Sequence, residues 1–412
     1  MDRTVPGAFP TIQAAVNASL PGDRILIAGG TYHENVVSTN SNLQFLGKNT
    51  VWDGTLTNGT PGVCLTATGS NVVVQGFIFR AGQSSVAQVQ LNGAGCRVAK
   101  CSSRGPNARF VRVSGSNAVV DTCTLFSVNS TAVEIIGDGA VVRKIKGRQC
   151  DDFVIRVVGA RATVTDCVLS VNEDGPTVSI SGTNAVVARN TLMDCDSALS
   201  INGNGAVVEK NKLINSGDAS VTGDAIVIRG NTIQGAVDDS NGLTVNSSTL
   251  TGGGVIENNK FKDVSQSGLL LNCQNVIVRG NSVTGCATES GEHAWNISGS
   301  GNRLTNNLAV GGGTHGFNVT GANNILVKCT AIDAAADGFN ISNTGNTLLN
   351  CIALICTGEG LDNGGTGTTV TGCTFKKNRL DVGNNGTFLN IATFAADNTF
   401  TTGGPAQLPQ VD

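Results

Sequence analysis

The 412-residue chain has few charges, few prolines and few aromatic rings. Charged residues make up 14% of it and nearly cancel, so a net charge of -3 offers little attraction for nucleic acid or an anionic membrane. No apolar run approaches the ~18–20 residues that a membrane-spanning helix needs. Aromatic residues amount to 4%, which leaves few rings for stacking on sugars. We therefore expect no nucleic-acid partner and no membrane span.

Glycine is abundant instead, with 54 residues, and the β-branched and small polar residues typical of strands and turns surround it. One pattern recurs along the chain, most often every 22 residues: a turn residue, usually glycine or asparagine, and then a β-branched run. The repeats begin at Asn71, Gly95, Asn117, Gly139, Arg161, Asn184, Gly205, Ala225, Gly253, Asn275, Gly301, Asn323, Gly345 and Gly367. This period predicts an all-β fold, a single right-handed parallel β-helix domain over residues 1–412.

A column of small residues lies six positions after each repeat start. On six successive repeats this position is an asparagine, and cysteines such as Cys123 and Cys351 occupy it on repeats before and after them. The asparagines are Asn190, Asn211, Asn231, Asn259, Asn281 and Asn307. Because successive coils stack ~4.8 Å apart, the asparagines should form a hydrogen-bonded ladder. Stacked cysteines fit the geometry of a disulfide poorly, so we expect buried thiols among the thirteen cysteines.

Both ends of such a coil need covering, because an open coil exposes apolar core and strand edges. Residues 10–18 place Ile12, Ala15 and Val16 on one face, which predicts a short N-terminal capping helix. Residues 1–36 should form this cap and the first coil, residues 37–384 the remaining coils, and residues 385–412 a C-terminal cap or tail. Inside the coils, Trp295, Phe317, Phe339 and Leu361 should form one inward apolar stack.

The N-terminal stretch carries three recognisable segments. They are Thr11-Ile12-Gln13-Ala14-Ala15-Val16, Gly22-Asp23-Arg24-Ile25-Leu26-Ile27 and Gly30-Thr31-Tyr32-His33-Glu34-Asn35-Val36. This opening resembles that of pectin methylesterases and of many right-handed β-helix proteins in the pectin lyase-like superfamily. The resemblance implies the β-helix fold and a carbohydrate-related activity. The Gln-Asp-Thr and Asp-Phe-Ile-Phe-Gly segments of pectin methylesterases and the Asp-Pro-His segment of alginate epimerases are absent, and the polygalacturonase motifs do not occur in order.

Two polar columns are candidate sites, because active sites of this superfamily lie on the outward face of the corresponding strand. The first column is Arg112, Glu134 and Arg156, three charges in register on neighbouring strands. The arginines could bind a carboxylated sugar, with Glu134 as acid or base. The alternative is mutual charge compensation on a solvated sheet.

The second column is His293, His315, Asp337 and Glu359, which fall on four successive coils. These imidazoles and carboxylates are candidate general acids and bases, beside the candidate substrate-binding residues Asn296, Asn318, Asn340 and Asp362. The alternative is that the loop-to-strand junction simply accommodates polar residues. No metal-ligand spacing occurs, so we predict neither a metal nor a cofactor.

Two functions remain open from the sequence. One is a carbohydrate-active or carbohydrate-binding protein acting on an acidic polysaccharide as a hydrolase, lyase or epimerase. The other is a non-catalytic surface β-helix, such as an adhesin, a spacer or a phage-fibre-like rod. The first 20 residues lack the blocks of a signal peptide, so an extracellular location requires that a leader was removed, and otherwise the protein is cytoplasmic.

Overall fold

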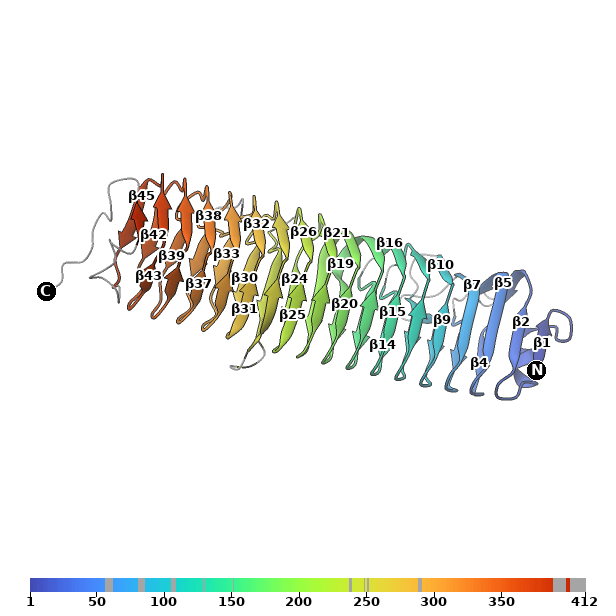
Figure 1. Cartoon of the computed structure of the whole chain (residues 1–412). Coiled ribbons are helices and arrows are strands. Elements are labelled where there is room, and N and C mark those ends of the chain that lie inside the picture. The colour runs from blue at the N-terminus through green and yellow to red at the C-terminus, as the bar shows by residue number, and fades with distance from the viewer. Residues whose placement is uncertain are drawn as a thin grey trace. The chain divides into compact units, whose positions relative to one another are not determined.

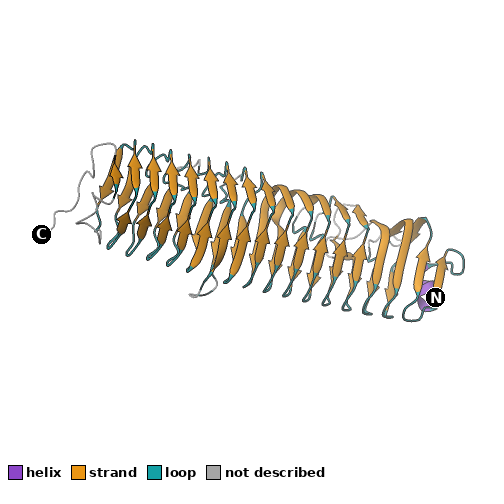
Figure 2. Ribbon diagram, in the orientation of Figure 1, coloured by secondary structure: helices purple, strands orange, loops and turns teal. Residues whose placement is uncertain are grey.

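The computed structural model describes residues 1–55, 62–80, 86–104, 109–128, 130–150, 152–236, 239–247, 249, 252–287, 291–387 and 398–400. The chain divides into two compact units, Met1–Asn202 and Gly203–Asp412. Within each unit, the strands pair in parallel with their counterparts on the neighbouring coils (Figure 1). Strands dominate the described residues (Figure 2), and the predicted all-β parallel solenoid is confirmed. The single-domain interpretation stays a prediction.

The strands of the first unit form three ladders, which we call faces A, B and C. Face A contains β4 (Val36–Ser38), β6 (Leu65–Ala67), β8 (Ala87–Leu91), β11 (Arg109–Val113), β14 (Val133–Ile136) and β17 (Ile155–Val158). Face B contains β1 (Asp2–Val5), β2 (Arg24–Ile27), β9 (Arg97–Ala99), β12 (Val119–Asp121), β15 (Val141–Arg143), β18 (Thr163–Thr165) and β20 (Val186–Ala188). Face C contains β3 (Gly30–His33), β10 (Ser102–Arg104), β13 (Thr124–Phe126) and β16 (Lys146–Cys150). Four long strands bend across two faces: β5 (Gln44–Asp53), β7 (Val73–Arg80), β19 (Val168–Ser181) and β21 (Thr191–Asn202).

The second unit repeats this pattern with shorter strands. Its face A contains β24 (Ala219–Thr222), β27 (Leu243–Asn246), β30 (Leu269–Asn272), β33 (Trp295–Ile297), β36 (Phe317–Val319), β39 (Phe339–Ile341), β42 (Glu359–Asn363) and β45 (Leu380–Asn384). Its face B contains β22 (Val207–Glu209), β25 (Ile226–Arg229), β28 (Gly254–Glu257), β31 (Val276–Arg279), β34 (Arg303–Thr305), β37 (Ile325–Val327), β40 (Thr347–Leu349) and β43 (Thr369–Thr371). Its face C contains β23 (Lys212–Ile214), β26 (Thr232–Gln234), β29 (Lys260–Lys262), β32 (Ser282–Thr284), β35 (Leu308–Val310), β38 (Thr330–Ile332), β41 (Ile352–Leu354), β44 (Thr374–Lys376) and β46 (Thr399–Phe400).

The repeat starts owe their composition to backbone conformation. From Asn71 (φ 56°) to Gly345 (φ 66°), the residues at these positions have left-handed φ values. Glycine adopts this conformation without a Cβ clash, and asparagine tolerates it better than most residues. Arg161 (φ 57°) and Ala225 (φ 53°) adopt it as well, at a cost of about 1–2 kcal/mol each. The period in the sequence therefore marks one obligatory left-handed turn per coil.

The asparagine ladder is present in the second unit and is buried. The Nδ2 of Asn211 donates to Oδ1 of Asn231 at 3.0 Å, and Asn231 repeats the bond to Asn259 at 2.9 Å. Asn259 and Asn281 continue the ladder to Asn307. These side chains are 1–3% exposed, so the ladder satisfies amides that the bend would otherwise bury without partners. A second buried column, Asn302, Asn324 and Asn346, satisfies backbone groups in the same way and was not predicted.

The interior is otherwise apolar, as expected. The Phe317 ring stacks on Trp295 with centroids 5.4 Å apart and on Phe339 at 5.1 Å, and all three rings are fully buried. The thirteen cysteines are all buried thiols, and none is cross-linked within the described chain, which confirms that prediction. Burial raises the pKa of thiols such as Cys123, so they stay protonated at neutral pH.

The described N-terminal residues include one helix, α1 (Ile12–Asn17), which lies against β1, β2 and β4. Its Thr11 N-cap accepts a hydrogen bond from the backbone of Ala14, and the Glu34 carboxylate accepts two more from Ile12 and Gln13. No helix among the described residues is long and apolar enough to cross a bilayer. Most of the predicted C-terminal cap, residues 388–397 and 401–412, lies outside the described residues.

Candidate functional site

A polar column lies just ahead of the face A strands of the second unit. Its members stand two residues before the inward-facing side chains of β33, β36, β39 and β42, and they are His293, His315, Asp337 and Glu359. The rings of His293 and His315 stack with centroids 4.9 Å apart. His315 Nδ1 lies 2.9 Å from Oδ2 of Asp337, whose Oδ1 accepts the backbone N–H of Glu359 at 2.7 Å. The structure thus brings the whole predicted column together.

The predicted asparagine column runs beside it, in register along face A. Asn318 Nδ2 donates to Asn296 Oδ1 at 3.3 Å, and Asn340 Nδ2 donates to Asn318 Oδ1 at 3.0 Å. Asn340 Nδ2 also lies 3.4 Å from Nε2 of His315. Nδ1 of His315 thus faces the Asp337 carboxylate, while Nε2 lies beside the Asn340 amide.

Three carboxyl groups meet at the end of these two columns. One oxygen from each of Asp337, Glu359 and Asp362 lies within 4.8 Å of the other two. Burial alone would raise the pKa of Asp337, but hydrogen bonds from His315 and Glu359 outweigh it and lower that pKa. The hydrogen bond to Asp337, together with burial and repulsion from Asp337 and Asp362, raises the pKa of Glu359 to about 7. Burial and the charge of Asp337 also raise the pKa of Asp362.

This arrangement moves the pKa values of Asp337 and Glu359 in opposite directions. Asp337 stays ionised, while Glu359 keeps its proton to about neutral pH and can donate it. Neighbouring groups whose pKa values move in opposite directions are the arrangement that acid–base catalysis uses. His293 differs from both, because burial and His315 lower its pKa to about 4 and leave it neutral at pH 7.

Two residues missed by the sequence reasoning complete the cluster. Arg379 Nη2 lies 3.0 Å from Oε1 of Glu359, and the arginine is 68% exposed. Gly383 pairs with Asp362 on the next coil, and a Cβ there would lie 3.1 Å from Cγ of Glu359 and 3.7 Å from Oδ1 of Asp362. A glycine therefore leaves the outward side of both carboxyl groups uncrowded. Arg379 had no signal in the sequence, but Gly383 falls in the same column as Asp362.

The three acidic residues could together offer oxygens to one hard cation, the ligand type that Mg²⁺ and Ca²⁺ prefer. The proton held by Glu359 and the guanidinium of Arg379 already offset part of the negative charge. Nothing further in the cluster points to a bound metal.

The other predicted column lies on face A of the first unit and is a different kind of site. Glu134 Oε1 contacts Arg156 at 2.8 Å, and Oε2 contacts Arg112 at 3.2 Å. Arg109, which the sequence reasoning missed, adds a contact to Oε2 at 2.8 Å. Glu134 is only 6% exposed, whereas Arg112 and Arg156 are more than 40% exposed. Both carboxylate oxygens thus pair with guanidinium groups, as mutual charge compensation would require, and a role of Glu134 as acid or base stays a prediction.

The coil architecture agrees with a comparison of the whole chain against family descriptions. The model for the right handed beta helix region matches residues 87–233 and 219–401. The chain belongs to the right-handed β-helix family. No curated protein is detectably similar to this β-helix protein.

Several solved β-helix structures resemble the chain at low identity. A mannuronic acid specific polysaccharide family 6 lyase from human gut microbiota is 15% identical, with 84% of this chain and 86% of that chain covered and a TM-score of 0.46. A mutant tailspike of E. coli bacteriophage HK620, solved with a pentasaccharide, is 13% identical, with 94% of this chain and 76% of that chain covered and a TM-score of 0.42. The catalytic domain of an alpha-1,3-glucanase is 8% identical, with 98% of this chain and 68% of that chain covered and a TM-score of 0.35. These values carry no argument about what this β-helix protein does.

Proposed function

We propose that this protein is a polysaccharide-cleaving enzyme whose active site is the carboxyl cluster of the second unit. The observation that carries the proposal is the division of protons within the cluster, with Glu359 protonated to about pH 7 beside an ionised Asp337. A carboxylic acid that is still protonated at neutral pH can protonate a glycosidic oxygen as the bond breaks.

The contacts support a separate role for each residue. Glu359 is the general acid, and Asp362 is the carboxylate that faces the reacting carbon. Asp337 is a positioning residue, because it is 7% exposed and holds both His315 and the backbone of Glu359. His315 keeps Asp337 ionised, and Asn340 orients His315 and presents its amide beside the cluster. Asn296, Asn318 and the neutral His293 extend this surface for binding neighbouring sugar units.

The short separation of the carboxyl groups favours hydrolysis with retention of configuration. Retaining glycosidases place their two carboxyl groups about 5–5.5 Å apart, whereas inverting enzymes need about 6.5–9.5 Å to admit a water. In this scheme Glu359 gives its proton to the leaving oxygen while Asp362 forms an ester with the anomeric carbon. Water then attacks that carbon, Glu359 takes up a proton from the water, and Asp362 is released.

The test is a polysaccharide panel containing polygalacturonate, alginate and neutral glucans, with new reducing ends as the readout. Glu359→Gln should lower kcat about 10²–10⁴-fold on the polymer that is cleaved. The matched control is Glu257→Gln, since Glu257 is 17% exposed and pairs with Arg279 just as the 19%-exposed Glu359 pairs with Arg379. Unchanged cleavage by Glu359→Gln would refute the assignment. A folded wild-type protein that cleaves nothing while binding a polymer would support the non-catalytic alternative.

The outcome also separates the reaction types. Hydrolysis gives saturated ends and, for retention, a first-formed product with the substrate's anomeric configuration. Elimination gives an unsaturated uronate that absorbs ultraviolet light, and that product would replace the hydrolytic scheme by a lyase scheme. A role on an external polymer also implies an extracellular location, which we infer on this ground alone.

We further infer that α1 serves as the N-terminal cap predicted from the sequence. Its buried residues Ile12, Ala15 and Val16 face β1, β2 and β4, and Glu34 fixes its first turn. Ile12→Asp should therefore expose the first coil and lower the melting temperature, whereas Asn17→Asp, at an exposed position of the same helix, should have a much smaller effect.

A further inference from the structure

A basic and aromatic surface lies on face C of the first unit, apart from the residues discussed so far. Three neighbouring strands each point two side chains outward there, separated by one buried residue. We call the six residues the basic–aromatic patch: Ser102, Arg104, Thr124, Phe126, Lys146 and Arg148. Strand register places Arg104 and Arg148 on either side of Phe126, one strand spacing of ~4.8 Å away in each direction.

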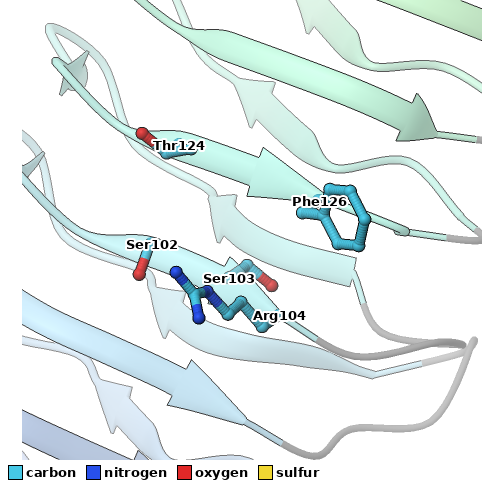
Figure 3. A pocket seen from close by; sticks show the side chains of 5 residues that line it. All are labelled: Ser102, Ser103, Arg104, Thr124 and Phe126. Atoms are coloured by element: carbon cyan, nitrogen blue, oxygen red, sulfur yellow. The ribbon is translucent and has the colours of Figure 1, made fainter.

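Phe126 is unusual in this chain. It is 48% exposed, and every other phenylalanine, tyrosine and tryptophan of the described residues is buried or half-buried. Figure 3 shows it on β13 beside Thr124, with Ser102 and Arg104 on the adjacent strand. These residues line a hollow of about 500 Å³. An exposed ring in a hollow is the kind of surface on which the apolar face of a sugar ring packs.

The charges of the patch are uncompensated. Arg104, Lys146 and Arg148 are exposed, and none of them forms an ion pair with another described residue. The contrast with face B of the same unit is direct, because Arg97 and Arg143 there share the carboxylate of Asp121. Within the described residues, a chain of net charge -3 thus places three cations that form no ion pair around the single exposed aromatic ring.

We propose that the basic–aromatic patch binds a uronate-containing oligosaccharide. One pyranose ring packs on Phe126, and its carboxylate and that of a neighbouring unit accept charge-assisted hydrogen bonds from Arg104 and Arg148. The hydroxyls of Ser102 and Thr124 and the Lys146 ammonium bond the remaining oxygens. Single-stranded nucleic acid is the less suitable ligand, because its sites stack successive bases on several rings and the patch has one.

The choice of a glycan as the ligand rests on the proposed function, but binding at the basic–aromatic patch requires no catalysis. Binding is therefore measured by calorimetry with oligogalacturonate in the Glu359→Gln background, where cleavage is suppressed. The methyl ester of the same oligomer is the matched ligand, since it keeps the sugar rings and removes the charge. We expect weaker binding of the ester and a loss of affinity as salt is raised.

Phe126→Ala and the double variant Arg104→Ala/Arg148→Ala should each weaken binding about tenfold or more. The matched controls are Ile277→Ala and Arg303→Ala, an exposed apolar residue and an exposed arginine in register on face B of the second unit. Their affinity should stay unchanged, and melting temperatures check that all four variants fold. Equal affinity of the patch variants and wild type would overturn the proposal. So would a single-stranded oligonucleotide that binds the patch more tightly than oligogalacturonate. Absence of cleavage by the wild-type protein, with binding at the patch intact, would count against the carboxyl cluster alone.

Discussion

Glu134 and Glu359 occupy comparable places in the two units, yet their surroundings give them opposite properties. Each lies in or at the start of a face A strand, with charged residues on neighbouring coils. The neighbours of Glu134 are three arginines that hold both of its oxygens. The neighbours of Glu359 are Asp337 and Asp362, with one exposed arginine, and they raise its pKa to about 7.

The comparison shows that stacking alone does not determine the electrostatic surroundings of a carboxyl group. In a parallel solenoid every column brings side chains within one strand spacing, so charges of opposite sign neutralise each other and become structural. Charges of like sign cannot all remain ionised, and one of them keeps its proton. The sign of the charge on the next coil thus decides whether a carboxyl group forms an ion pair or is favoured to keep its proton.

The largest effect should come from exchanging each glutamate for glutamine and measuring cleavage of the responsive polysaccharide. Glu134→Gln should keep kcat within a few-fold of wild type, in contrast to the ~10²–10⁴-fold loss for Glu359→Gln. The reason is that three guanidinium groups already contact the Glu134 carboxylate, which suits it to charge compensation. A large loss of kcat in Glu134→Gln with an unchanged melting temperature would return Glu134 to the catalytic role considered from the sequence.

The second effect is on the free energy of unfolding, and here the substitution of Glu134 should matter. Glu134→Gln should destabilise the fold by about 2–3 kcal/mol, because three guanidinium groups lose a buried, charged acceptor. Denaturant unfolding measures the change. Glu209→Gln is the control, since Glu209 pairs with Arg229 alone and should lose only about 0–1 kcal/mol. Equal losses in the two variants would mean that the three-arginine arrangement adds nothing.

A third test uses pH. The folded-state pKa of Glu359 is raised from 4.5 to about 7, so its stabilising contribution is full below 4.5 and is lost as pH rises through about 7. Glu359→Gln imitates the protonated acid and should melt at the same temperature as wild type near pH 4, but higher near pH 8. The kcat/KM of the wild type should fall over the same window as the acid loses its proton. Parallel melting curves of the two proteins at every pH would contradict the raised pKa.

The smallest effect concerns Arg379. Its charge lowers the pKa of Glu359, so Arg379→Ala should move the alkaline limb of the activity profile to higher pH. Stability should change by only about 0–1 kcal/mol, because the arginine is 68% exposed. Arg303→Ala, which removes an exposed arginine elsewhere in the unit, should leave the profile in place.

Most of the fold was predictable because it follows from one repeated local requirement. The left-handed turn at positions such as Asn117 and Gly345 selects glycine or asparagine, and its recurrence fixes which residues stack. The ladder at Asn231 and the buried thiol of Cys351 follow from that register. The column of His315, Asp337 and Glu359 could be read from the sequence for the same reason.

The sequence by itself therefore determined the coil, its register and the order of residues along each column. Only the tertiary structure decided which charges were paired. Arg109 lies outside the column of Arg112, Glu134 and Arg156, yet its guanidinium contacts the Glu134 carboxylate. The tertiary structure also decided that neighbouring carboxyl groups raise the pKa of Glu359 and that Phe126 is exposed between two arginines that form no ion pair within the described residues. Protonation and exposure depend on burial and on distances of a few ångströms, which a repeat of 22 residues does not specify.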